Sequence, residues 1–442
     1  MNKEKKRFPF GTVIGVLVLA VLAAGAFMVF RDTTPPTIGI EPDVAHVGLP
    51  TEYVVTVDDP GSGLKSVEIS AVQGEKNVPI LSKQMPQGTR QAKEKFTLPK
   101  DQFKDGALSI QVTARDNSLY PFGAAGKSTA SKEFSLDTKP PRIFVKTHTT
   151  NMNQGGAGLL VYALSEVAKE TGIQVDERFF PAYRQASFGD QNIYYCMFAI
   201  PWDTPPAKFK PMIMAEDTAG NSVRRSFNYH VNARKFRKDR INLSDSFMEK
   251  TIPEFHQYLT GEGSPLEQYL KINNEVRAQN RAQLVKVGRD TADEMLWKGT
   301  FKRLPNSANR ARFADARDYY YKGKKVDHQT HLGLDLASIR QAPVPAGNDG
   351  IVVFADFLGI YGNVVIIDHG LGLQTLYAHL SSIAVARNDN VTRGQTIGHT
   401  GTTGLAGGDH LHYGVLISGI PVQPFEWWDA RWISHNITSK LQ

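Results

Sequence analysis

The chain has 442 residues, of which 41% are hydrophobic and 21% charged, and its formal net charge is +7. A soluble domain holds roughly 100 to 200 residues, so the length predicts about three modules. The ordinary balance of apolar and charged residues excludes a polytopic membrane protein and a chain that is disordered throughout.

The N-terminal segment is the first predicted element. A basic stretch, residues 3–7, precedes an uncharged apolar run over residues 8–30. About 20 apolar residues in a helix span a bilayer, so we expect a transmembrane anchor over 8–30. The basic flank favours a cytoplasmic N-terminus and export of everything after Arg31. The small residues 24–26 also fit a signal-peptide cleavage site, but the apolar run continues to Phe30, which favours an uncleaved anchor.

A repeated motif marks the start of two similar modules. Asp-Thr-Thr-Pro-Pro-Thr-Ile begins at Asp32, and Asp-Thr-Lys-Pro-Pro-Arg-Ile begins at Asp137. Short alternating apolar segments separated by turn signals predict β-sandwiches. They resemble tandem bacterial immunoglobulin-like domains, which we place at 31–137 and 138–233. Catalytic side chains do not cluster there, so we expect spacers or binding modules that could meet an envelope protein partner.

Two features of this half bear on its environment. The single cysteine, Cys196, lies in an apolar, aromatic run, which indicates a buried structural thiol. The basic run 234–240 is typical of a solvated linker. Because an exported chain rarely meets nucleic acid, we expect no nucleic-acid partner.

Residues 241–298 lack the β-branched clusters of the preceding modules and predict a helical connector. Ser264, followed by Pro265 and Glu267, is a typical helix start, with proline at the first helical position and an acid in the first turn. The segment is too apolar to remain solvated, so we expect it to pack on the next domain. Two alternatives stay open: the connector covers the functional groove of that domain, or it braces the domain elsewhere.

The remaining domain, residues 299–433, is Gly-rich and β-patterned, and it carries three compact histidine motifs. They are His331-Leu-Gly-Leu-Asp335, Tyr-Ala-His379-Leu and His410-Leu-His412. A hydrolytic zinc site typically takes three ligands from His, Asp and Glu and leaves a position for water. Strand alternation places the last two histidines on one face.

The spacing of the first motif needs a bend. A straight strand would separate His331 and Asp335 by about 13 Å, too far for shared ligation. Gly333 between them permits a bend or bulge. Ligand type alone would also suit iron or manganese.

With these motifs, the sequence over about 301–426 resembles the lysostaphin-type (LytM-like) zinc metallopeptidases. The resemblance also rests on the Gly-rich segments 362–370 and 394–398. It implies one Zn²⁺ per chain and assigns five positions, all of which are filled here. The implied zinc ligands are His331, Asp335 and His412, and the implied catalytic residues are His379 and His410.

One departure from the family pattern lies just before the histidine pair. Family members often have Thr and Pro at the positions of Gly407 and Asp409, so the departure bears on substrate preference more than on zinc. The implied reaction is amide hydrolysis by an activated water. The division of proton transfer between His379 and His410 stays open.

Other conspicuous residues have less specific interpretations. His328 is either a fourth ligand or part of the groove, while His369 and His399 are expected to be exposed turn residues. The aromatic run 319–321, with Arg312 and Arg317, either contacts substrate or packs at a domain edge.

The predicted fold is multidomain and mainly β, with a transmembrane helix, two immunoglobulin-like β-sandwiches, a helical connector and an antiparallel β metallopeptidase domain. The predicted function is a zinc-dependent peptidoglycan endopeptidase that hydrolyses stem-peptide crosslinks outside the inner membrane. The predicted location is a single-pass anchor in that membrane with the C-terminal domains in the periplasm or outside the cell. The alternatives are a noncatalytic wall-binding regulator or activator of another peptidoglycan hydrolase, and an exported zinc peptidase that cuts proteins.

Overall fold

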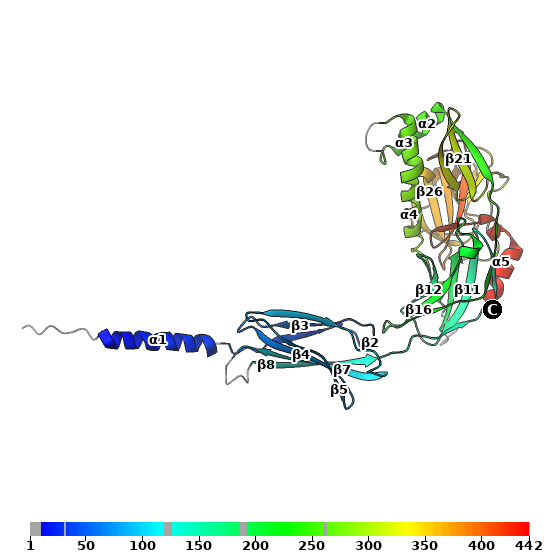
Figure 1. Ribbon diagram of the computed structural model, residues 1–442. Helices are drawn as coiled ribbons and strands as arrows, with labels where there is room; N and C mark the ends of the chain where they lie inside the picture. The colour runs from blue at the N-terminus through cyan, green and yellow to red at the C-terminus, as the bar shows by residue number, and fades with distance from the viewer. Residues whose placement is uncertain (1–9, 31, 119–125, 186–191, 260–262, 442) are drawn as a thin grey trace, which may run out of the picture. The chain divides into compact units, whose positions relative to one another are not determined.

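The computed structural model describes residues 10–30, 32–118, 126–185, 192–259 and 263–441. The chain forms two compact units, residues 1–140 with 216–222, and residues 141–215 with 223–442. Both are mainly β with few helices (Figure 1). The mainly β prediction is therefore confirmed.

The first unit begins with α1, which spans Phe10–Phe30 and lies within the segment predicted as an anchor. Across the described ranges, no helix is long and apolar enough to cross a membrane. The structure therefore gives no support to the transmembrane prediction.

A two-sheet sandwich follows α1. One sheet has the order β1-β3-β6 and the other β2-β8-β7-β4-β5. Their bounds are Thr37–Glu41 (β1), His46–Val47 (β2), Tyr53–Asp58 (β3), Leu64–Gln73 (β4), Lys76–Gln84 (β5), Gln91–Phe96 (β6), Gly106–Asp116 (β7) and Lys127–Leu136 (β8). Tyr53 of β3 stacks on Phe96 and meets Phe134 of the other sheet edge-on, so both sheets share one core. The immunoglobulin-like assignment stays a prediction.

The second unit opens with another pair of sheets, ordered β14-β15-β11-β9 and β13-β12-β16-β17, beside the pair β10-β18. Their bounds are Ile143–Val145 (β9), Thr150–Asn153 (β10), Ala157–Leu164 (β11), Glu170–Val175 (β12), Arg178–Pro181 (β13), Tyr183–Arg184 (β14), Ile193–Ala199 (β15), Met212–Glu216 (β16), Ser222–Arg225 (β17) and Tyr229–Asn232 (β18). Cys196 of β15 is fully buried, and its thiol donates to Phe180 O at 3.2 Å. The predicted buried thiol is confirmed.

The connector begins with a strand where a solvated linker was expected. β19 (Lys238–Leu243) pairs in parallel with β21 (Asp315–Tyr321), and Arg240 lies over the ring of Tyr320. The linker prediction was wrong for residues 238–240 only, because the apolar Ile241 and Leu243 that follow pack with Tyr319 and draw this stretch into a strand. Residues 233–237 have no regular secondary structure, and Lys238 and Arg240 are exposed.

Helices follow this strand. They are α2 (Asp245–Thr251), the 3₁₀ turn η3 (Ile252–Phe255), α3 (Pro265–Lys271), the π-helical turn η4 (Ile272–Val276) and α4 (Arg277–Val287). The helix start predicted at Ser264 is confirmed, and Ser264 and Glu267 form a capping box there. Figure 1 shows α3 and α4 along one side of the sheet that holds β26. Ile272, Val276 and Leu284 share a core with that sheet, so this part of the connector braces it.

The C-terminal domain contains a small sheet, β19-β21-β22, and, within the described residues, a ten-stranded antiparallel sheet. The path of the large sheet is β20-β23-β30-β27-β26-β25-β28, with β24, β29 and β31 paired beside it. The bounds are Ala308–Ala311 (β20), Lys324–His331 (β22), Leu334–Ala337 (β23), Pro343–Pro345 (β24), Gly350–Phe357 (β25), Asn363–Asp368 (β26), Leu373–Ile383 (β27), Asn390–Val391 (β28), Thr396–Thr400 (β29), Leu411–Ile417 (β30) and Ile420–Val422 (β31). The chain continues through the 3₁₀ turn η6 (Pro424–Trp428) and α5 (Ala430–Asn436) to a last 3₁₀ turn, η7 (Thr438–Lys440).

The second sandwich and the C-terminal domain are joined by buried polar contacts. Glu426 of η6 accepts hydrogen bonds from Asn153 Nδ2 at 2.9 Å and from Ala157 N at 3.2 Å. Lys440 Nζ donates to Leu159 O at 2.9 Å. Burial raises the pKa of Glu426 to about 7. Together with a continuous apolar core, these contacts make one compact unit of the two domains.

Candidate metal centre

The first histidine motif lies at a break between two strands. His331 is the last residue of β22, and Asp335 lies in β23 after a two-residue gap. This break brings His331 Nε2 to 2.9 Å from Asp335 Oδ1. The chain therefore changes direction between the two residues, as the distance argument requires.

His412 completes the group from the neighbouring strand. β23 pairs with β30 so that Asp335 lies opposite His412. His412 Nδ1 is 3.0 Å from both Asp335 Oδ1 and His331 Nε2. A Cβ atom on Gly333 would lie 2.5 Å from His412 Nε2. Glycine is thus required at this position, because any side chain would collide with the imidazole.

The three facing atoms are all electron-pair donors. The carbonyl of Arg312 can only accept, so the Nδ1–H of His331 donates to it at 2.9 Å. In the neutral ring, Nε2 of His331 then presents a lone pair to Asp335 Oδ1 and to His412 Nδ1. Lone pairs about 3 Å apart repel one another unless a proton or a metal cation lies between them. The arrangement is therefore that of a cation site.

The donor set fits zinc. Two imidazole nitrogens and one carboxylate oxygen are the ligand number and type of a hydrolytic zinc site, with one position left open. The ligand atoms of His331, Asp335 and His412 all lie within 4.8 Å of one another, and the two histidines are buried. Carbonyl partners such as Arg312 O, which fix the tautomer of a metal-binding imidazole, are usual around such sites.

The protonation states suit metal binding. Burial lowers the pKa of His412 to about 4, which keeps its ring neutral. Burial favours a higher pKa for Asp335, but the neighbouring histidines, His331 foremost, hold that pKa well below its usual range. Near neutral pH the site therefore presents an ionised carboxylate and a neutral His412 imidazole.

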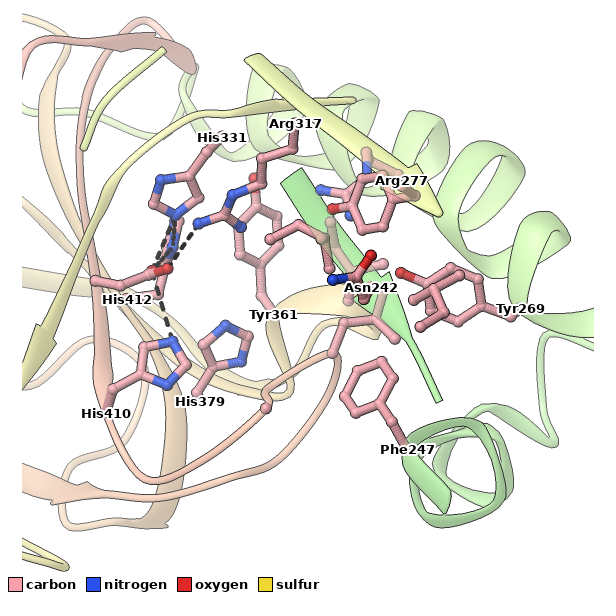
Figure 2. Close-up of a pocket in the computed structure, with 17 residues that line it drawn as sticks. Asn242, Phe247, Tyr269, Arg277, Arg317, His331, Tyr361, His379, His410 and His412 are labelled. Atoms are coloured by element: carbon pink, nitrogen blue, oxygen red, sulfur yellow. Dashed lines mark hydrogen bonds and ion pairs between the residues drawn. The ribbon is translucent and has the colours of Figure 1, made fainter. Parts of the chain in front are cut away.

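Two further histidines lie beside the three (Figure 2). His379 follows Ala378, which pairs with His412 across β27 and β30. The ring centroid of His379 is 4.9 Å from that of His410 and 5.7 Å from that of His412. His410 Nε2 lies 3.5 Å from Asp335 Oδ1. The structure therefore brings all five residues of the family pattern together, while their roles stay predictions.

Backbone carbonyls orient the two additional rings. His379 Nδ1–H donates to Thr403 O at 2.8 Å, and His410 Nδ1–H donates to Gly408 O at 2.7 Å. These bonds fix both rings, and Nε2 of His410 faces Asp335 Oδ1 at 3.5 Å. His379 has φ +60°, a conformation that non-glycine residues adopt mainly at functional or strained positions.

The two rings differ in their affinity for protons. Burial, helped by His410 and His412, lowers the pKa of His379 well below its ordinary value. Burial also acts to lower the pKa of His410, but the hydrogen bond and charge of Asp335 raise it above the ordinary value.

Arg317 was not in the predicted site, and the structure places it there. Its Nη2 lies 2.9 Å from Asp335 Oδ2, the carboxylate oxygen that the ligand histidines do not contact. β21 pairs with β22 so that Asp315 lies opposite His331, which puts Arg317 two residues along the same strand. Strand alternation could have placed it on the same face as Asp315, but the pairing of β21 with β22 was not evident from the sequence.

The other histidines lie outside the group. His328 Nδ1 is 2.6 Å from Asp318 Oδ1 on the exposed side of β22, and the structure does not bring it to the ligands. His369 was expected to be exposed but is fully buried, between Asp349 O and Thr375 Oγ1. That prediction was wrong because its turn packs under Phe301, whose ring meets the imidazole edge-on.

His399 and the aromatic run also differ from expectation. His399 lies in strand β29 and contacts Ser382 Oγ through Nδ1 at 3.1 Å, so it is not a turn residue. Tyr319 lines the cavity beside the metal centre, whereas Tyr321 donates to Asp245 at the domain edge. Tyr321 thus packs at the domain edge, as one alternative held, while contact of the run with substrate stays a prediction.

A cavity of about 340 Å³ opens beside the five residues. Its far wall comes from the connector: Asn242 of β19, Phe247 of α2 and Tyr269 of α3 (Figure 2). Tyr361 stands next to the ligands, with its ring centroid 5.5 Å from that of His412. The connector thus braces the sheet with one part and lines the groove with another.

Comparison with known proteins supports the resemblance. Residues 329–424 match the family model described as Peptidase family M23. The chain is 47% identical over 94 residues to the DD-carboxypeptidase/endopeptidase Mpg of Neisseria meningitidis serogroup B, which covers 21% of this chain and 22% of that protein. It is 44% identical over 92 residues to the peptidoglycan DD-endopeptidase ShyA of Vibrio cholerae, with 21% of each chain covered.

Among solved structures, a peptidase M23 from Pseudomonas aeruginosa is similar with a TM-score of 0.39 and 19% identity, covering 63% of this chain and 95% of that one. The matched stretch spans about a fifth of the length of these two curated relatives. The C-terminal domain is similar to family M23 peptidases, as the sequence motifs imply.

Proposed function

We propose that this chain is a zinc-dependent peptidoglycan endopeptidase that hydrolyses stem-peptide crosslinks. The observation that carries the proposal is the convergence of three electron-pair donors, His331 Nε2, Asp335 Oδ1 and His412 Nδ1, at 2.9 to 3.0 Å. The names of the relatives Mpg and ShyA, both of which act as endopeptidases, support the substrate class.

His331, Asp335 and His412 would hold the zinc ion. When bound, zinc supplies Lewis acidity that polarises a peptide carbonyl and makes water more acidic. His379 and His410 both line the cavity, where a neutral ring takes a proton from water and a protonated ring gives one to the leaving amine. The backbone carbonyls on the two Nδ1 atoms keep both rings in the orientation that this transfer needs.

Arg317 and the cavity walls would position the reacting groups. Arg317 holds Asp335 Oδ2, so the carboxylate presents Oδ1 to the metal. Leu243 and Tyr361 line the groove with apolar and aromatic surface, which excludes water around a bound peptide. These residues shape a site for an extended peptide more than for a small charged ligand.

We further propose that the domains after Arg31 lie outside the inner membrane. In the sequence, the basic residues 3–7 that precede the apolar run favour this orientation. The two sandwiches would then act as spacers towards the wall or as docking modules for an envelope protein. Labelling of a reporter cysteine after residue 31 in intact and permeabilised cells tests this orientation.

The function is tested with the purified full chain and crosslinked muropeptide dimers. We expect dimers to be converted to monomers, with loss of activity on chelation and recovery on addition of zinc. Zinc binding without hydrolysis would favour the alternative, a noncatalytic regulator of another hydrolase. Hydrolysis of a denatured protein but not of muropeptides would favour an exported peptidase that cuts proteins.

A further inference from the structure

Three buried carboxylates converge in the first sandwich. Asp32 precedes β1, Asp59 follows β3, and Asp116 is the last residue of β7. One oxygen from each lies within 4.8 Å of the others. Their exposed fractions are 9%, 1% and 4%, so three acidic groups are largely withdrawn from water in one place.

Local hydrogen bonds hold each carboxylate in position but do not neutralise its charge. Asp32 accepts from Ser62 N at 2.6 Å, Asp59 from Gly61 N at 2.8 Å, and Asp116 from Ser118 N at 2.8 Å. These donors are neutral backbone groups. Among the described residues, the three aspartates form no ion pair with a lysine, arginine or histidine. Like charges at this separation repel strongly in a buried setting.

Two of the carboxylate oxygens have no hydrogen-bond partner. Asp59 Oδ2 and Asp116 Oδ2 are both buried, and in the part of the chain that the structure describes nothing donates to either. A buried charged oxygen without a partner is costly, and native proteins satisfy such atoms with a donor, a proton or a metal ion. Burial, together with the charges of Asp59 and Asp32, raises the pKa of Asp116.

Two glycines make space for the carboxylates, because a side chain at either position would collide with them. A Cβ atom on Gly61 would lie 2.3 Å from Asp32 Oδ2, and one on Gly126 would lie 2.2 Å from Asp116 Oδ1. Glycine at both positions allows the carboxylates to approach each other from the three chain segments. Asp32 also begins the Asp-Thr-Thr-Pro-Pro-Thr-Ile motif, which recurs at Asp137.

We propose that Asp32, Asp59 and Asp116 bind a calcium ion in the first sandwich. All of the side-chain donors are oxygens, which suits a hard cation and distinguishes this group from the histidine centre. Calcium accepts irregular coordination and combines carboxylates with carbonyls and water, whereas Mg²⁺ demands near-octahedral geometry. The ion ties the segment that enters the sandwich to the β3–β4 turn and to the end of β7.

Calcium binding to the metal-stripped full chain tests this inference by equilibrium dialysis. We expect one calcium per chain, with a Kd between about 10⁻⁵ and 10⁻³ M and weaker binding of Mg²⁺. Asp59→Asn should abolish binding because it removes a buried ligand charge at nearly constant volume. Asp43→Asn is the matched control and should bind like wild type, because Asp43 is a fully exposed aspartate that pairs with Lys132.

Thermal unfolding gives a second readout that does not depend on hydrolysis. Calcium should raise the unfolding temperature of wild type and Asp43→Asn but not of Asp59→Asn. Without calcium, Asp59→Asn should be at least as stable as wild type, since repulsion among the carboxylates is relieved, and this would show that it folds. His412→Ala should retain calcium binding, which separates this site from the zinc site.

Three results would overturn the inference. They are no saturable calcium binding by wild type up to about 10⁻² M, well above the weak extracellular range, equal binding by Asp59→Asn, and a preference for Mg²⁺ over calcium. If wild type binds no calcium, protons shared among the three carboxylates would instead explain how they can be buried together.

Discussion

Arg317 Nη2 lies 2.9 Å from Asp335 Oδ2, while Asp335 Oδ1 lies 2.9 Å from His331 Nε2. One oxygen of the Asp335 carboxylate thus contacts the Arg317 guanidinium, and the other contacts the histidines of the candidate metal centre. The side chain of Arg317 is largely buried, so the contact is only weakly screened by solvent. The arginine therefore fixes which oxygen Asp335 presents to the candidate metal centre.

Arg317→Met should lower the affinity for zinc by about 10 to 100-fold, the usual effect of losing a residue that orients a ligand. Methionine keeps an unbranched side chain of somewhat shorter length but has no charge and no N–H donors. Competition with a chromogenic chelator measures the affinity. Arg310→Met is the control: it changes an exposed arginine of β20 and should leave the affinity for zinc unaltered. Equal affinities in both variants would remove Arg317 from the metal site.

The ligand assignment predicts the effect of removing a ligand. Asp335→Ala and His412→Ala should each lose most of the bound zinc, because two remaining ligands hold the ion poorly. His328→Ala is a suitable control, since His328 pairs with Asp318 at the exposed side of its strand. Metal analysis of the purified proteins decides the matter, and full zinc content in both ligand variants would refute the assignment.

The pKa of Glu426 predicts a pH dependence of stability. Its value rises from 4.5 to about 7 on burial, so between these values the folded chain binds more protons than the unfolded chain. The contribution of Glu426 to the free energy of unfolding should therefore be largest below pH 4.5. It should fall as the pH rises from 4.5 to 7, by about 1.4 kcal/mol per pH unit.

Glu426→Gln removes this titration. The difference in free energy of unfolding between wild type and Glu426→Gln should change over pH 4.5 to 7 and be constant above it, as urea titrations would measure. Glu249→Gln, an exposed connector position, should follow wild type throughout. A difference that is flat across this range would mean that Glu426 is not the buried acid that the contacts with Asn153 and Ala157 indicate.

The connector should restrict access to the groove through Phe247. Phe247→Ala removes part of the wall opposite the ligands, so we expect a severalfold higher rate on crosslinked muropeptides at unchanged zinc content. Tyr258→Ala makes a comparable truncation in the same connector away from the groove and should show no gain. If the connector only braces the sheet, Phe247→Ala will be equally or less active than wild type.

The sequence motifs were sufficient to identify the candidate ligands, because residue type and strand alternation restrict a zinc site strongly. His331, Asp335 and His412 could be named without coordinates, and Gly333 could be expected to permit the bend. The reason for Gly333 is nevertheless tertiary, since the ring of His412 occupies the place of its missing side chain. Pairing of β23 with β30 creates that contact, and no local pattern predicts it.

Other features depended on contacts between distant segments. The basic run around Arg240 forms a strand because β21 offers it a parallel partner some eighty residues later in the sequence. His369 is buried because Phe301 covers its turn, although the local sequence is that of an exposed loop. Burial of single polar residues is decided by packing across the whole domain, which composition and periodicity do not specify.

The central claim is that His379 and His410 transfer protons beside a zinc ion held by three other residues. Hydrolysis of crosslinked muropeptide dimers by His379→Ala and His410→Ala, each with its zinc content measured, tests it most directly. We expect both variants to retain most of the zinc and to lose about 10²- to 10⁴-fold in rate, the usual contribution of positioned proton transfer. Near-normal rates in both variants at normal zinc content would contradict the account.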